Sequence, residues 1–493
     1  MITFAVCIAA LVLGFVFYGR FTEKIFGPDD RKTPAVEIND GADYVPMKGW
    51  RIFLIQLLNI AGLGPIFGAL NGALFGPVVY LWIVLGTIFA GGVHDYMSGM
   101  ISMRNRGASV SELTGKYLGN TMLQVMRVFS VVLLVMIGVV FSKGPAGLLG
   151  MLTPAEGDEN IWLYVIIVYY FIATFLPIDK IIGKAYPVFG IALLVMALGV
   201  GSVIFFSPSY EMPEFWNGMA NTHPQGIPVW PFLFITVACG AISGFHSTQS
   251  PLMARCCTSE RQGRRIFYGA MVAEGIIAMV WAAAGMSFYE DAQALLAAGA
   301  GVNAVVYEIC QTTLGKVGSV LAILGVIACP ITSGDTAYRS ARLTLADWVH
   351  LDQKTIRNRL IITVPLLAAG VLICQIDYSV IWRYFSWSNQ TLAMIMLWTA
   401  ASYLGRNGRN MTICVVPAAF MSAVTMTYFM VAPECMGMLW SGLGVGMSVY
   451  YPLALATGIA FAGLCMVLFF RQMRKTGKGF PTVSEAEHNL PKG

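Results

Sequence analysis

Glu274 is the most isolated charged residue of this 493-residue sequence. It lies in the apolar run Met271–Ile277, and no basic residue lies within one helical turn of it. Burial in apolar surroundings disfavours the charged form of a carboxyl group, so Glu274 could load and release a proton near neutral pH. The alternative is a neutral, hydrogen-bonded glutamic acid that only fixes helix packing.

Two histidines and an aspartate are the next ionisable candidates. His246 lies beside a run of glycine and hydroxyl residues, where it could bind a carboxylate or titrate with a proton gradient. A hydrogen-bonded packing histidine is the alternative. His94 and Asp95 fall near the end of an apolar segment, and Arg104 and Arg106 follow. For this pair we favour an interfacial cap or ion pair, with a role in ion coupling as the alternative.

Two further polar runs interrupt apolar segments. Thr332, Ser333 and Asp335 follow a Cys-Pro pair. Their oxygen atoms could bind a hard cation, or the run could form an ordinary helix end. The second run lies deeper in its apolar segment and is predicted to line the protein interior: Ser388, Asn389 and Gln390.

Two apolar segments contain helix-breaking residues at mid-length. Glycine and proline there weaken a helix and release backbone polar groups, which hydrocarbon cannot satisfy. Both segments must therefore face the interior of a helix bundle. Close packing of small residues would explain one such segment, but two of them indicate a binding site. The candidate substrate-binding residues are Gly62, Gly64, Pro65, Gly68 and Asn71 in the first segment and Ser243, Gly244, His246, Ser247 and Gln249 in the second.

The composition identifies the elements that must position these residues. The chain is 57% hydrophobic and only 12% charged, about half the charge of a soluble protein. Its apolar blocks of about 20 residues match the bilayer core. The net charge of +5 gives no reason to expect nucleic-acid binding. The ten cysteines show no metal-ligand spacing, and no nucleotide-binding or catalytic motif occurs, so we expect no metal, no cofactor and no enzymatic activity.

Thirteen membrane spans are predicted in this all-α, polytopic membrane protein. With the N-terminus outside and the C-terminus in the cytoplasm, all but three of the 31 Lys and Arg residues lie in cytoplasmic connections or in the C-terminal tail. The segment 300–314 is too short and polar for another span and is predicted to be a surface or re-entrant helix. The predicted spans are 2–19, 52–74, 77–100, 123–143, 161–177, 187–206, 229–250, 265–288, 317–336, 357–375, 379–404, 411–431 and 448–470.

The two interrupted spans are five spans apart and run in opposite directions. This spacing predicts two five-helix units of inverted topology, at 52–206 and 229–404, as in secondary transporters. Residues 1–51 would be a peripheral helix and a cytoplasmic loop. Residues 411–470 would add two peripheral spans, and 471–493 a cytoplasmic tail. The repeat rests on topology alone, because the halves show no similarity in sequence.

Several of these segments together resemble the carbon starvation protein A family. They are Gly64–Gly68, Ala90–Met97, Ser243–His246, Ala273–Glu274 and Ser388–Ala393. The resemblance runs in order over most of the chain and implies a bacterial inner-membrane transporter with a LeuT-like core. Family members are associated with uptake of short peptides and pyruvate during nutrient limitation, with protons as the coupling ion. Carried over by position, the substrate path would be lined by Gly64, Pro65, Ser243, Gly244, His246, Glu274, Ser388, Asn389 and Gln390.

We therefore expect secondary active uptake of a small organic nutrient by alternating access. The substrate would lie at the two helix breaks. Coupling would use H⁺ at Glu274, His246, His94 and Asp95, or a cation at Thr332, Ser333 and Asp335. The residues leave open peptide or pyruvate, and H⁺ or Na⁺, including a sodium-coupled amino-acid symporter. The chain is shorter than the best-known family members, whose substrates need not transfer. The alternatives of another class are a channel and a membrane-embedded nutrient sensor.

Overall fold

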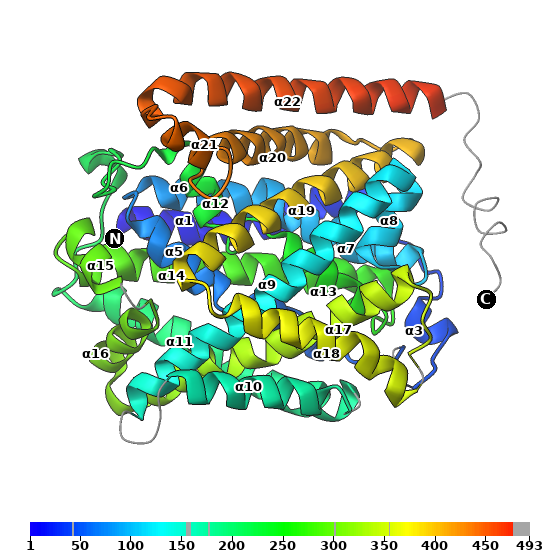
Figure 1. Cartoon of the computed structure of the whole chain (residues 1–493), viewed down its shortest axis with the longest axis horizontal. Helices are drawn as coiled ribbons and strands as arrows, with labels where there is room; N and C mark the ends of the chain where they lie inside the picture. The colour runs from blue at the N-terminus through cyan, green and yellow to red at the C-terminus, as the bar shows by residue number, and fades with distance from the viewer. Residues whose placement is uncertain (42–43, 154–158, 176–177, 300–301, 354, 477–493) are drawn as a thin grey trace.

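The computed structural model describes residues 1–41, 44–153, 159–175, 178–299, 302–353 and 355–476, and these fold into a bundle of helices (Figure 1). This confirms the prediction of an all-α, polytopic membrane protein. The helices are α1 (Ile2–Leu13), α2 (Gly19–Phe26), α3 (Pro34–Glu37), α4 (Gly49–Ile60), α5 (Gly64–Ala73), α6 (Val78–Leu85), α7 (Gly92–Arg104), α8 (Val110–Leu118), α9 (Asn120–Leu152), α10 (Glu159–Ala173), α11 (Ile178–Phe206), α12 (Val229–Thr236), α13 (Gly244–Ala254), α14 (Gly269–Phe288), α15 (Ala292–Ala298), α16 (Val302–Ala322), α17 (Cys329–Trp348), α18 (Ile356–Ile373), α19 (Tyr378–Arg406), α20 (Thr412–Val431), α21 (Gly437–Gly442) and α22 (Met447–Thr476).

The number of spans is lower than thirteen when length and apolar composition are the criteria. The described residues contain nine helices that meet both criteria, or ten when the bent pair α4 and α5 counts as one span. Three predicted spans fall short of them. The helix α10 has only 15 residues, α12 and α13 are short and separated, and α19 is rich in polar side chains. The count of thirteen and the inverted repeat therefore remain predictions.

The first predicted helix break is present between α4 and α5. The two helices bend by 49° at residues 61–63. Pro65 lies in the first turn of α5, where its missing N–H group costs nothing. A side chain at Gly64 would overlap Cys239, so the glycine allows α5 to approach the second break closely.

The second break is longer and separates α12 from α13. Residues 237–243 between these helices are non-helical, and Gly240 has a φ of +91°, which favours glycine. This segment packs on α5, because Gly68 lies against the backbone of Thr236 and Val237. The two interruptions therefore meet inside the bundle, although they are far apart in the sequence.

The remaining helices surround this meeting point. The end of α22 lies on the opposite side of the bundle from the N-terminus, and α22 runs along one edge, against α20 (Figure 1). The segment predicted as a surface or re-entrant helix, 300–314, forms the first part of α16, from Val302 onward, and its placement at the surface stays a prediction. The helix α16 is kinked at Gly315 (φ +60°) and continues toward α17 within one apolar stretch, Ala304–Trp348.

Candidate functional site

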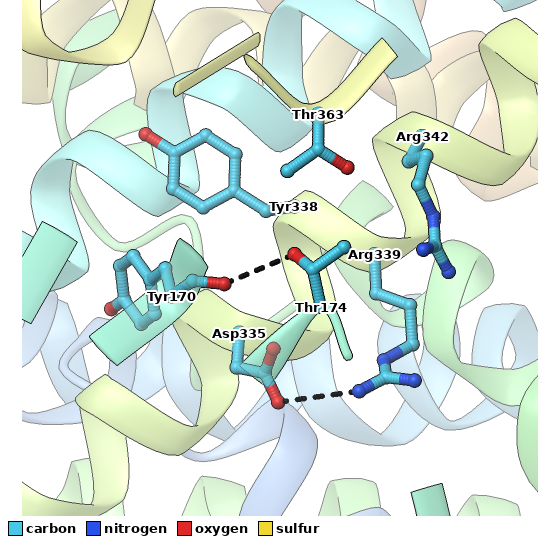
Figure 2. A pocket seen from close by; sticks show the side chains of 7 residues that line it. All are labelled: Tyr170, Thr174, Asp335, Tyr338, Arg339, Arg342 and Thr363. Carbon is cyan, nitrogen blue, oxygen red and sulfur yellow. Dashed lines mark hydrogen bonds and ion pairs between the residues drawn. The ribbon is translucent and has the colours of Figure 1, made fainter. Parts of the chain in front are cut away.

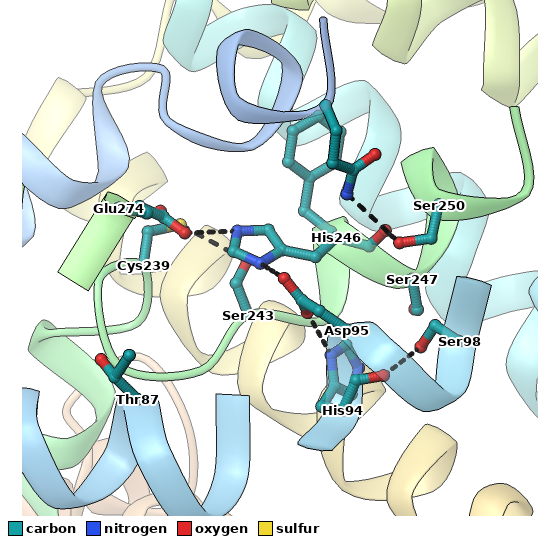
Figure 3. A network of polar contacts seen from close by, with 12 residues as sticks. Thr87, His94, Asp95, Ser98, Cys239, Ser243, His246, Ser247, Ser250 and Glu274 are labelled. Carbon is teal, nitrogen blue, oxygen red and sulfur yellow. Dashed lines mark hydrogen bonds and ion pairs between the residues drawn. The ribbon is translucent and has the colours of Figure 1, made fainter. Parts of the chain in front are cut away.

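A chain of buried ionisable side chains joins α7, α13 and α14 (Figure 3). Asp95 on α7 accepts two contacts of 2.8 Å, one from Nδ1 of His94 at Oδ1 and one from Nδ1 of His246 at Oδ2. The other ring nitrogen of His246, Nε2, lies 3.3 Å from Oε2 of Glu274 on α14. All four side chains are completely buried. Three helices thus bring four predicted coupling residues into one connected network.

The position of His94 and Asp95 corrects their interpretation as an interfacial cap. The span continues to Arg104, about 14 Å of helix beyond Asp95, and both side chains are buried, so the pair lies within the bundle. The polar residues that follow Asp95 suggested from the sequence that the membrane span ends there. In the structure Ser98 donates its hydroxyl proton to the His94 carbonyl at 2.7 Å, and the surrounding helices cover the rest.

Cys239 completes the network beside His246 and Glu274. Its thiol lies in the second helix break and contacts Ser243 at 3.4 Å. The ligand atoms of Cys239, His246 and Glu274 lie within 4.8 Å of one another, and within the described ranges this is the group of side chains that could hold a metal ion. Sequence reasoning missed Cys239, since a lone cysteine in an apolar segment is usually a packing residue. The expected absence of a metal stays a prediction.

Asn389 on α19 holds the start of α13 in place. Its Oδ1 accepts a hydrogen bond of 2.7 Å from the backbone N–H of Phe245, and its Nδ2 donates to the Ser243 hydroxyl at 2.9 Å. Gly244 lies against the backbone of α19, where a side chain would not fit. The neighbouring Gln390 donates to the Phe234 carbonyl at the end of α12, at 3.0 Å. One polar run of α19 therefore satisfies backbone groups on both sides of the second break.

The helix before the first break, α4, also contributes polar groups to this region. The amide of Gln56 on α4 donates to Ser250 of α13 at 3.3 Å, and Ser250 donates to the His246 carbonyl at 2.9 Å. On the far side of α4, Ser333 donates to the Leu58 carbonyl at 3.3 Å. Gln56 and Ser250 were not among the predicted site residues, although a glutamine inside an apolar segment was an available signal.

The other predicted residues are divided between the site and its surroundings. Ser247 donates to the Gly244 carbonyl, and Gln249 donates to Thr248, so both bond locally within α13. Asn71 donates to Phe67 of its own helix, α5. Thr332 likewise bonds to the Cys329 carbonyl one turn earlier in α17. Three more are buried around the two breaks and pack there: Gly62, Pro65 and Ser388.

Asp335 belongs to a separate cluster near the middle of α17. Its Oδ2 lies 3.8 Å from Nη2 of Arg339, and Arg342 lines the same small cavity (Figure 2). Two guanidinium groups beside one carboxylate do not favour binding of a cation at Asp335. No described contact joins this cluster to the His94–Asp95–His246–Glu274 network.

Comparison with known proteins identifies the family. The family model described as carbon starvation protein CstA matches residues 1–149, 148–299 and 286–428. The chain belongs to this family. The resemblance carried by the short motifs is thereby confirmed, and the match covers both helix breaks and all four residues of the central network.

Individual CstA relatives differ in similarity and in length. An uncharacterized membrane protein of Haemophilus influenzae is 44% identical over 346 residues, which cover 60% of this chain and 93% of that protein. A protein named peptide transporter CstA from Campylobacter jejuni is 28% identical, over 57% of this chain and 49% of its own length. A Bacillus subtilis protein of the same name is 29% identical, over 56% of each chain. The chain spans about half the length of these named relatives.

Solved structures of a manganese transporter from Eremococcus coleocola share the fold. Two of its mutants superpose with TM-scores of 0.51 and 0.50, at 11% and 12% identity, over 88% of this chain and 99% of theirs. At this identity the similarity concerns the fold alone. It places the CstA chain among proteins whose helices are arranged as in a membrane transporter.

Proposed function

We propose that this CstA-family protein takes up a small organic nutrient by proton-coupled alternating access. The observation that carries the proposal is the buried chain His94–Asp95–His246–Glu274, which lies beside two helix breaks that meet inside the bundle. The family's named peptide transporters and the transporter-like fold support transport rather than an enzymatic role.

The charges of the network explain how a proton could be exchanged. His246 contacts a carboxylate at each ring nitrogen, which suits a doubly protonated ring between Asp95 and Glu274. With His94 neutral and Cys239 as a thiol, this arrangement carries a net charge of about −1. One further proton on Glu274 removes that charge, and a buried net charge is costly. Opening the network to one side of the membrane and then the other would load and release this proton.

The substrate would bind where the two breaks meet. The N-termini of α5 and α13 start there, at Gly64 and Gly244, and helix N-termini favour anionic groups. A carboxylate is shared by the two substrate classes expected for the family, short peptides and pyruvate-like monocarboxylates. Binding at this point would place the carboxylate close to His246, so that its charge and the coupling proton influence each other.

Sodium coupling is the second candidate, and one observation favours it. The Ser333 hydroxyl on α17 lies 3.3 Å from the Leu58 carbonyl, two residues before α4 ends at the first break. A hydroxyl group and carbonyl oxygens released by a helix break are ligands suited to Na⁺. In this case Thr332 and Ser333 would bind the ion, and Glu274 would remain structural.

Uptake into proteoliposomes tests the proposal directly. Labelled pyruvate and a labelled dipeptide are supplied in parallel under an imposed pH gradient, a sodium gradient or neither. We expect accumulation of one substrate under the pH gradient, and its loss in Glu274→Gln. The control is Glu290→Gln, which changes an exposed glutamate just beyond the same helix. Accumulation that follows only the sodium gradient, with Glu274→Gln fully active, would reject proton coupling and favour the Ser333 site.

The same preparation separates transport from the other classes of function. A channel would give solute flux that does not saturate and cannot accumulate solute against its gradient, together with single-channel currents. A membrane-embedded sensor would bind a nutrient without moving it. Either result would contradict alternating access, whichever ion drives it.

A further inference from the structure

Cys239, His246 and Glu274 converge from three segments of the chain (Figure 3). Cys239 lies in the second helix break, His246 on α13 and Glu274 on α14. Their ligand atoms all lie within 4.8 Å of one another, and all three residues are buried. Because the residues come from separate segments, no ligand spacing in the sequence could indicate that they meet.

The distances within this group suit a zinc ion. Zn²⁺ binds imidazole nitrogen and carboxylate oxygen at about 2.0–2.2 Å and thiolate sulfur at about 2.3 Å, in a tetrahedral arrangement. Two such ligand atoms then lie about 3.3–3.7 Å apart. Nε2 of His246 and Oε2 of Glu274 are 3.3 Å apart, and the Cys239 sulfur lies at most about 1 Å beyond the required spacing. An ion bonded to these atoms takes the place of protons between them, so it needs no separate cavity.

The ligand atoms have few other partners. Nε2 of His246 and both carboxylate oxygens of Glu274 are covered by protein and have no hydrogen-bond partner among the described residues. Leaving buried polar atoms without a partner is costly, and one ion would satisfy all of them. The Cys239 sulfur accepts from the Asn389 amide at 3.7 Å, a contact that a metal-bound thiolate can keep.

Asp95 supplies the outer contact that metal-bound histidines usually have. Its Oδ2 lies 2.8 Å from Nδ1 of His246. A proton on Nδ1 that is donated to Asp95 leaves the lone pair on Nε2, the nitrogen that faces Glu274. The other oxygen of Asp95 is held by His94 at 2.8 Å. The orientation of the His246 ring is therefore fixed from α7, as a metal ligand requires.

We propose that Cys239, His246 and Glu274 bind Zn²⁺ and that Asp95 orients His246 for this role. A thiolate and an imidazole favour Zn²⁺ over Mg²⁺ and Ca²⁺, which prefer oxygen ligands. Binding releases the Nε2 proton of a doubly protonated His246 and the thiol proton of Cys239. The two charges of the ion replace those of the two protons, so the net charge of about −1 on the network is unchanged.

The bound ion would tie the second break to α13 and α14. It would also exclude the coupling proton from Glu274 and His246, so Zn²⁺ would inhibit uptake. This consequence rests on the proposed function, whereas the binding site itself does not. Binding is therefore tested without substrate and without an ion gradient, and it can succeed or fail independently of proton-coupled uptake.

Co²⁺ is the spectroscopic probe for the site, in purified, tag-free protein in detergent. We expect a saturable visible absorption with a thiolate-to-cobalt charge-transfer band, which Zn²⁺ abolishes and Mg²⁺ does not. Cys239→Ser should lose the charge-transfer band. His246→Gln and Glu274→Gln should bind Co²⁺ at least tenfold more weakly. Cys414→Ser, which changes a cysteine of α20 that is equally buried, is the matched control and should behave as the wild type does.

Asp95→Asn distinguishes an orienting residue from a ligand. The charge-transfer band should persist, with an affinity about 10–100-fold lower, as is usual when an outer contact of a metal ligand is lost. An unchanged affinity would reject the role of Asp95. A wild type without the charge-transfer band would overturn the proposal, as would equal bands in Cys239→Ser and the control. Cys239→Ala repeats the comparison in case the serine variant does not fold.

Discussion

Asp95 joins the two halves of the central network. Its two carboxylate oxygens contact two different histidines, one preceding it on α7 and one on α13, 151 positions away in sequence. An ionised carboxylate can accept hydrogen bonds at both oxygens and can stabilise a protonated His246. An amide has one accepting oxygen and no negative charge. In the proposed mechanism the protonation of His246, and through it that of Glu274, therefore depends on a carboxylate of another helix, α7.

Asp95→Asn is predicted to reduce proton-driven uptake by about tenfold or more, because losing about 1.4 kcal/mol of stabilisation of the His246 cation already corresponds to a factor of ten. Uptake at a fixed pH gradient is the measurement. His94→Gln should have a smaller effect, since His94 contacts only the far oxygen of Asp95. Equal and full activity of both variants would show that His246 does not depend on Asp95.

His246→Ala is predicted to raise the substrate concentration needed for half-maximal uptake and to abolish accumulation against a gradient. The ring links Asp95 to Glu274, and its removal leaves two buried carboxylates without the positive charge between them. Initial uptake rates across a range of substrate concentrations give this result. An unchanged substrate affinity would show that the substrate does not bind at α13.

At the scale of elements, the proposed site depends on two interrupted helix pairs that pack against each other. The helix α5 carries Gly64 and Gly68 one turn apart, and both face the non-helical segment 237–243. Without Cβ atoms, these positions allow backbone to lie against backbone, where the free polar groups of the break can be covered by protein. Asn389 and Gln390 of α19 then supply the side-chain donors and acceptors that the break lacks.

Gly64→Ala is predicted to destabilise the protein by about 1–3 kcal/mol, the usual cost of overpacking, because the new methyl group overlaps the Cys239 side chain. The double variant Gly64→Ala with Cys239→Gly should recover part of this loss. The unfolding midpoint in detergent measures both effects. Gly463→Ala on α22, where a side chain meets open space, is the control. A midpoint of Gly64→Ala equal to that of the control would mean that α5 does not lie against the second break.

At the scale of the whole molecule, one face is closed by an ion cluster that joins segments far apart in sequence. Arg104 at the end of α7 makes hydrogen bonds of 2.9 Å with both carboxylate oxygens of Glu260, and its guanidinium lies 4.1 Å from the centre of the Phe26 ring. Hydrogen bonds from Arg31 hold the pKa of the adjacent Asp29 well below its usual range. A depressed acid pKa contributes stability above the unfolded value of about 4 and loses it only at lower pH, so this face should not open through Asp29 near neutral pH.

Glu260→Gln is predicted to open this face. It removes the close ion pair of the partly buried Arg104 and leaves Asp29, at 3.8 Å, as the remaining carboxylate, at a cost of up to about 3–5 kcal/mol. The thiol of Cys257, completely buried close to Glu260 in the sequence, then becomes a reporter. Its reaction with a water-soluble thiol reagent should accelerate several-fold. Arg261→Ala breaks an exposed pair with Asp30 and should leave the rate unchanged. Equal rates in both variants would show that Arg104 and Glu260 do not close this face.

The sequence by itself determined the properties that depend on local composition. Long apolar blocks identify a membrane protein, because so few charges cannot cover a water-soluble surface. The glycine and proline positions predicted both helix breaks, because these residue types weaken a helix wherever they occur in it. Glu274 was recognisable as a charge without a local partner, and the short motifs indicated the CstA family.

Only the tertiary structure decided which polar groups meet. The sequence near Asp95 suggested an exposed helix end, yet helix packing buries this residue against His246, and no local pattern encodes a contact over 151 positions. Cys239 resembled an ordinary member of an apolar segment, and the contact of Gln56 with Ser250 on α13 could not be predicted from the residues around Gln56. Arg339 and Arg342 resembled cytoplasmic loop charges, and in the structure they line a small cavity beside Asp335. The physical reason is that hydropathy reports whether a segment enters the membrane, whereas the rotation and crossing of helices determine what each side chain contacts there.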